Sequence, residues 1–161
     1  GMALKIIGPS NETGTIEALR ARAAGKPVTF LHDCDDRLLV CEYRRALCVV
    51  LPSVYRPADG TETKVPELLG QTLLEGMACG TPVIAARIGG LQYLVSHRKT
   101  GLLVKPDDPQ SLAVAIKTLV QNPALRKRLG SNARREARKY EWSKIEPKFL
   151  ALYTSLITNQ S

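Results

Sequence analysis

The chain has 161 residues, of which 44% are hydrophobic, so it is long enough to bury the core of a single domain. No stretch approaches the roughly 18 uninterrupted apolar residues of a membrane-spanning helix, and the beginning lacks the pattern of a signal peptide. Aromatic residues make up only 5%, which argues against a surface that stacks nucleic-acid bases. We therefore expect a soluble, cytoplasmic protein that binds no nucleic acid.

The first two residues, Gly-Met, resemble the remnant of a cleaved expression tag. Residues 3–161 are then expected to form the domain, with its final helices at about 123–158. The four cysteines contain no Cys-x-x-Cys pair, and neither histidine is spaced around them as a zinc ligand would be. We predict no metal and interpret the cysteines as small buried thiols.

The net charge is +8, from 23 basic and 15 acidic residues, and much of the excess lies in residues 126–139. A basic stretch of this kind is typical of a solvated helix face. It is also compatible with binding to anionic lipid or to a phosphorylated ligand. Both interpretations stay open from composition alone.

Short apolar runs alternate with amphipathic stretches along the chain, a pattern typical of βα units and a mostly parallel sheet. Strands are predicted at residues 4–7, 28–31, 46–51, 83–86 and 102–104. Helices are predicted at residues 15–24, 36–45, 70–80, 109–121, 123–140 and 144–157. Residues 52–66 carry no apolar period and form a long loop. The fold class is α/β, a Rossmann-like three-layer domain with one mainly parallel sheet.

Two carboxylates flank the start of one predicted helix. Glu67 lies in the loop ahead of it, and Glu75 lies about one and a half turns inside it. The N–H groups of Gly70, Gln71 and Thr72 are expected to be free between them, which favours binding of a phosphate. Carboxylates hold paired sugar hydroxyls well. On spacing alone, a loop charge and a charge that offsets the helix dipole explain the two glutamates equally well.

Further motifs surround this helix start. They are Val49-Val50-Leu51-Pro52-Ser53, Met77-Ala78, Gly80, Pro82-Val83, Gly89-Gly90, Thr100-Gly101-Leu102-Leu103-Val104, Asp107 and Tyr140-Glu141-Trp142-Ser143. Together with the two glutamates, they resemble the C-terminal domain of glycosyltransferase family 4, the "glycosyl transferases group 1" enzymes. The resemblance covers residues 4–153. It implies the C-terminal, Rossmann-like half of a GT-B type enzyme.

The resemblance further implies retaining transfer of a hexosyl group from a nucleotide-sugar, a UDP- or GDP-sugar, to an acceptor, without a cofactor. Glu67, Gly70 and Gln71 would bind the donor sugar, and Glu75 the ribose. The implied diphosphate-binding residues are Gly70, Gln71, Thr72 and Gly90, and those beside the base are Leu31 and His32.

The chain departs from the family pattern in several ways. The Arg and Lys that usually neutralise the diphosphate are not found, and neither is the half that carries the acceptor site. We therefore assign no catalytic residue, and we expect an N-terminal domain as partner and no activity from this chain alone. Tyr93 stands where the family has a glutamate after the Gly-Gly pair, and the segment between Ser53 and Glu67 is longer than usual.

Two other functions are compatible with the sequence. A nucleotide-sugar epimerase or a phosphorylase would share the two-domain plan, but its cofactor lysine or different helix-start motif is not recognised in this sequence. A basic binding module would contact anionic membrane surface or a phosphorylated ligand without catalysis. A peripheral contact with the inner face of the membrane also fits an enzyme that acts on lipid-linked acceptors.

Overall fold

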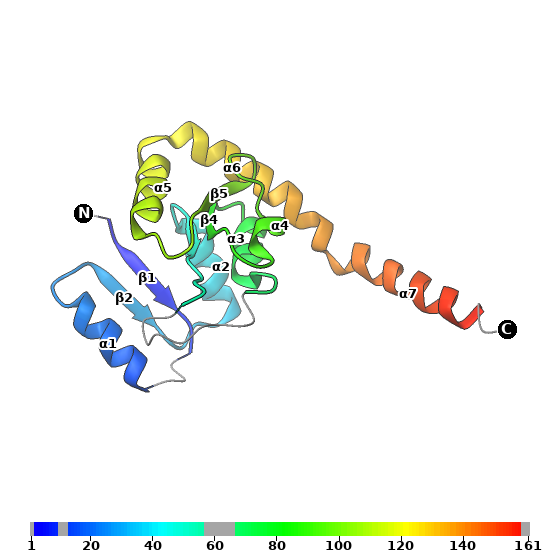
Figure 1. The fold of residues 1–161 in the computed structure, drawn as a ribbon, viewed down its shortest axis with the longest axis horizontal. Helices are drawn as coiled ribbons and strands as arrows, with labels where there is room; N and C mark the ends of the chain where they lie inside the picture. The colour runs from blue at the N-terminus through cyan, green and yellow to red at the C-terminus, as the bar shows by residue number, and fades with distance from the viewer. Residues whose placement is uncertain (1, 10–12, 57–66, 159–161) are drawn as a thin grey trace. The chain divides into compact units, whose positions relative to one another are not determined.

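A computed structural model describes residues 2–9, 13–56 and 67–158 (Figure 1). The chain divides into two compact units, Gly1–Cys41 and Glu42–Ser161. Each unit is described by itself. Residues 57–66, most of the predicted loop, lie outside the described residues.

The first unit is a βαβ unit. It contains β1 (Leu4–Ile7), α1 (Thr13–Ala23) and β2 (Val28–Leu31), and the two strands pair in parallel. The helix α2 (Asp36–Arg45) begins in this unit and ends in the second. Asp35 caps α2, because its Oδ1 accepts a hydrogen bond from the Leu38 N–H at 2.7 Å.

The second unit contains a three-stranded parallel sheet in the order β3-β4-β5. The strands are β3 (Val49–Leu51), β4 (Val83–Ala86) and β5 (Gly101–Val104). The helices are α3 (Gln71–Ala78), α4 (Leu91–Leu94), α5 (Pro109–Gln121), α6 (Pro123–Ala137) and α7 (Trp142–Thr158), with the 3-10 turn η1 (Arg138–Tyr140) between α6 and α7. Helix α3 therefore lies between β3 and β4 in the chain.

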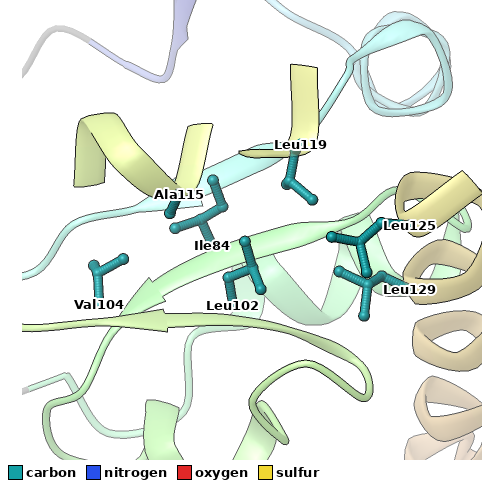
Figure 2. Packing of buried hydrophobic residues seen from close by; sticks show 7 residues of the cluster. All are labelled: Ile84, Leu102, Val104, Ala115, Leu119, Leu125 and Leu129. Atoms are coloured by element: carbon teal, nitrogen blue, oxygen red, sulfur yellow. The ribbon is translucent and has the colours of Figure 1, made fainter. Parts of the chain in front are cut away.

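The core of the second unit forms around β4, the central strand, where all four residues are buried. Ile84 packs in a cluster with β5, α5 and α6 (Figure 2). The cluster consists of Ile84, Leu102, Val104, Ala115, Leu119, Leu125 and Leu129. Val83 and Ala85, on the opposite face of β4, are fully buried too. Burial on both faces is what a parallel sheet with helical connections requires.

The predicted parallel pairing is confirmed within each unit. Strands β1 and β2 pair in the first unit, and the second unit has the order β3-β4-β5. A βα repeat fixes strand direction, whereas strand order depends on long-range packing. The third strand is shorter than predicted, because the N–H of Ala46 still donates to the carbonyls of Glu42 and Tyr43 at the end of α2.

The cysteines are less buried than predicted. Cys41 is exposed, whereas Cys34, Cys48 and Cys79 are half-buried. Burial raises the pKa of the Cys48 thiol, an effect that the nearby Arg126 guanidinium only partly opposes. Cys48 therefore stays protonated at neutral pH, in line with a structural rather than a reactive role.

Helix α7 differs from the other long helices of the second unit in having no buried residue. Its exposed apolar side chains include Trp142, Phe149, Leu152 and Ile157. In the described part of the chain, no helix combines the length and the apolar character that crossing a bilayer requires.

Candidate functional site

Glu67 lies over the N-terminus of α3. Its Oε1 accepts a hydrogen bond from the N–H of Gly70 at 3.2 Å. Gly70 is the N-cap of α3 and has a φ of 75°, a left-handed conformation that favours glycine. The half-buried carboxylate thus sits where the helix dipole favours negative charge.

The Gly89-Gly90 turn packs directly against this loop. The N–H of Gly90 donates to the carbonyl oxygen of Glu67 at 2.8 Å. A Cβ at position 90 would lie 1.6 Å from the Leu68 carbonyl oxygen, far inside van der Waals contact. The absence of a side chain at Gly90 therefore allows two backbone segments to meet. Glu67, Gly70 and Gly90 are brought together, as the sequence analysis expected.

The three amides expected to be free are not equivalent. The Gly70 N–H is already paired with Glu67, so for this amide the expectation is wrong. No described residue accepts a hydrogen bond from the N–H of Gln71 or Thr72, and both residues are exposed at the first turn of α3. Two unpaired amides at a helix N-terminus are a suitable site for an anion.

Glu75 is held by a tyrosine that the sequence analysis missed. The hydroxyl of Tyr43 donates to Glu75 Oε2 at 2.9 Å. Tyr43 is only 8% exposed, and its carbonyl oxygen accepts a 2.6 Å hydrogen bond from the buried Thr81 hydroxyl. The contact joins the end of α2 to the middle of α3. Its partners lie 32 positions apart, so spacing in the sequence carried no signal for it.

His32 and Leu31 belong to the first unit. His32 Nδ1 lies 3.2 Å from the carbonyl oxygen of Gly8, and its Nε2 lies 3.2 Å from the Arg20 guanidinium. These partners fit the neutral ring that donates through Nδ1 and accepts through Nε2. Both ring nitrogens of His32 are therefore engaged within the first unit, which supports a structural role at the end of β2 rather than that of a catalytic base.

Neither cavity described in the second unit is lined by Glu67 or Glu75. The larger, of about 490 Å³, runs along β5 and α5. The smaller, of about 220 Å³, lies at the carboxyl ends of the three strands and is lined by Ser53, Ala86 and Asp107 among others. Tyr93, 84% exposed on α4, projects into solvent.

His97 protects the edge of the sheet beside the larger cavity. Its Nδ1 accepts a hydrogen bond from the N–H of Leu103 on β5 at 3.0 Å, so the ring is neutral in this arrangement. Partial burial lowers the pKa of His97 below its ordinary value of 6.5, and the nearby cations Arg87 and Arg98 lower it further.

We expect the second unit to lose stability as the pH falls from about 6.5 through the lower pKa of folded His97. The unfolded chain keeps the ordinary pKa of His97 and binds more protons in this window. The free energy of unfolding therefore decreases as the pH decreases. In urea unfolding at pH 7.5 and 5.0, His97→Gln should lose less stability than the wild type, because glutamine accepts from Leu103 without titrating. An NMR titration midpoint for His97 at or above 6.5 would rule this out.

Known proteins resemble this chain in sequence along most of its length. The family model of "Glycosyl transferases group 1" matches residues 2–136. The chain is 34% identical over 158 residues to the D-inositol 3-phosphate glycosyltransferase of Corynebacterium glutamicum, covering 96% of this chain and 35% of the relative. It is 35% identical over 150 residues to that of Jonesia denitrificans, covering 91% and 33%. The chain thus spans about a third of the length of these curated relatives.

Solved structures agree with this result. Sucrose-phosphate synthase from Thermosynechococcus elongatus matches with a TM-score of 0.81 and 34% identity, over 97% of this chain and 39% of the synthase. Anabaena Alr3699/HepE, solved in complex with UDP-glucose, matches with a TM-score of 0.80 and 25% identity, over 95% of this chain and 41% of HepE. The expected fold, a Rossmann-like part of a GT-B glycosyltransferase, is therefore confirmed. By sequence and fold together, this chain belongs to the glycosyl transferases group 1 family.

Proposed function

We propose that this chain is the donor-binding part of a retaining glycosyltransferase that transfers a hexosyl group from a nucleotide-sugar. The observation that carries the proposal is the packing of the Gly89-Gly90 turn against the Glu67 loop at the start of α3. This packing fixes a carboxylate beside two unpaired helix amides. The complex of the HepE neighbour with UDP-glucose supports a UDP-sugar as the donor class, with a GDP-sugar as the alternative.

Each part of the donor has a matching group. The N–H groups of Gln71 and Thr72, at the positive end of α3, would bind diphosphate oxygens. Glu67 would leave the Gly70 amide and accept hydrogen bonds from hexose hydroxyls, which frees that amide for the diphosphate. Glu75, one turn further into α3, would bind the ribose hydroxyls. When Glu67 exchanges the Gly70 amide for hexose hydroxyls, its negative charge moves away from the phosphates.

The proposal is tested by NMR titration of the chain with UDP and with UDP-glucose. The largest amide shifts are expected at Gln71 and Thr72, whose N–H groups are unpaired, with smaller shifts at the neighbouring Gly70 and Gly90, whose N–H groups are paired with Glu67. UDP-glucose should add shifts at Glu67 that UDP alone does not cause. Shifts confined to the basic residues 126–139 would instead identify nonspecific anion binding to α6.

The chain alone is expected to transfer no sugar from any donor. Chemistry in a two-domain enzyme of this kind takes place in the cleft between the domains, where water is excluded and the acceptor is oriented. This chain covers only about 40% of the length of each of these two structural neighbours. Radiolabelled UDP-glucose should therefore give neither a glycosylated product nor free glucose above background. Reproducible turnover by the purified chain would contradict the expectation.

The alternative of a basic binding module is less well supported by the structure of α6. Two cations of the basic stretch, Arg126 on α6 and Lys139 in η1, have partners within the fold. Arg126 donates to the carbonyl oxygens of Leu119 and Val120 at the end of α5, and Lys139 pairs with Glu136 at 2.6 Å. These contacts fit helix capping and intrahelical pairing. We therefore keep peripheral membrane contact as a secondary property of the enzyme rather than as its function.

A further inference from the structure

We propose that Tyr43 is a positioning residue for nucleotide binding, which acts by fixing the carboxylate of Glu75 for the ribose hydroxyls. The inference rests on the proposed function of Glu75. It adds a residue from a different helix to the donor site and specifies what that residue discriminates, the ribose diol.

The geometry around Tyr43 favours a fixed donor. The side chain is 8% exposed, and its hydroxyl reaches Glu75 Oε2 at 2.9 Å. The backbone at the same position is anchored by the buried Thr81 hydroxyl, which donates to the Tyr43 carbonyl oxygen at 2.6 Å. Thr81 lies in the turn between α3 and β4, so Tyr43 contacts α3 at its middle and just beyond its end. The backbone that carries the phenol is thus anchored to the turn after the helix whose carboxylate the phenol contacts.

The chemistry of the carboxylate explains why this contact matters for a diol. A glutamate side chain on a helix surface samples several rotamers, and a ligand must restrict them on binding. The Tyr43 hydroxyl occupies one acceptor site on Oε2 and restricts the rotamer beforehand. Oε1 has no hydrogen-bond partner among the described residues, and it remains available to two neighbouring hydroxyls.

The test compares UDP with 2′,3′-dideoxy-UDP on the wild-type chain and on Tyr43→Phe. Wild type should bind UDP at least tenfold more tightly than the dideoxy ligand. Tyr43→Phe should weaken UDP binding about five- to tenfold and change dideoxy binding less than twofold. Full titration curves, fitted for both the limiting shift and the dissociation constant, give these ratios. Tyr153→Phe removes a tyrosine hydroxyl from an exposed site on α7 and should change the affinity for neither ligand.

Each outcome separates the possible roles. Equal weakening of both ligands by Tyr43→Phe would show a merely structural role and overturn the inference, as would full retention of the preference for UDP. If the wild-type chain bound UDP no more tightly than the dideoxy ligand, the proposed binding of the ribose by Glu75 would itself be overturned. If Tyr43→Phe fails to fold, the NMR signal of the tyrosine Cζ in labelled wild-type chain still tests the role of Tyr43. The Tyr43 signal should shift with UDP and not with the dideoxy ligand, and equal shifts would contradict the inference.

Discussion

Gly90→Ala is expected to destabilise the second unit by about 3 kcal/mol, the upper end of the usual range for overpacking. The cause is steric, because the added Cβ would lie 1.6 Å from the Leu68 carbonyl oxygen and 2.5 Å from its carbon. Both atoms belong to the backbone and cannot rotate away. Relief requires the Glu67 loop to separate from the turn, which breaks the hydrogen bond from the Gly90 N–H to Glu67. Urea unfolding followed by circular dichroism measures the loss.

Gly80→Ala is the matched control for this prediction. Gly80 has a φ of +82°, which strains any L residue, but a Cβ there would meet only Arg134 Cδ at an ordinary 3.7 Å. Gly90 has a φ of −69°, which alanine adopts freely. The control should therefore lose only about 1 kcal/mol, from backbone strain alone. A loss at Gly90 no larger than that at Gly80 would show that the two loops separate readily and that the turn does not fix the site.

Local signals in the sequence predicted most element boundaries. Asp35, Asp108 and Asn122 each cap the helix that follows, by accepting a hydrogen bond from the N–H three residues later. Capping of this kind is complete within four residues, so it can be recognised without knowledge of the fold. The strands at residues 4–7, 28–31 and 83–86 were also predicted with their observed bounds, since each is a short apolar run ended by a turn signal.

What the sequence did not predict depends on contacts between distant segments. The strand order of the second unit, β3-β4-β5, is decided by which strands become neighbours, and the βα pattern is the same for many orders. The hydrogen bond between Tyr43 and Glu75 is of the same kind. At Gly70, the sequence indicated a helix start correctly but could not show that Glu67 would turn back to its amide. The sequence therefore indicates candidate residues around the start of α3, whereas the hydrogen bonds of Glu67 and Glu75 depend on the fold.

Glu75→Ala is expected to reduce UDP binding below detection, whereas Glu67→Ala should leave it nearly unchanged. Binding of UDP to the wild-type chain is expected at a roughly millimolar dissociation constant, about −4 kcal/mol. A carboxylate that accepts ribose hydroxyls contributes on the order of 1.5–3 kcal/mol per charge-assisted bond at best, so losing it removes most of that affinity. Glu67 accepts from the Gly70 amide and would mainly meet the hexose, which UDP lacks. Titration by NMR shift mapping on both variants provides the measurement.

UDP-glucose reverses the expected importance of Glu67. In the wild-type chain the intact donor should bind more tightly than UDP, because the Glu67 carboxylate gains hexose hydroxyls in place of the Gly70 amide. Glu67→Ala should remove most of this difference, and Glu67→Gln should restore part of it, since the amide oxygen still accepts a hydrogen bond. The Gln variant also separates hydrogen bonding from charge, because it removes the repulsion between a carboxylate and the diphosphate. If Glu67→Ala instead strengthened the binding of both ligands equally, repulsion would dominate at this position, and the hexose contact would have to be assigned to another residue.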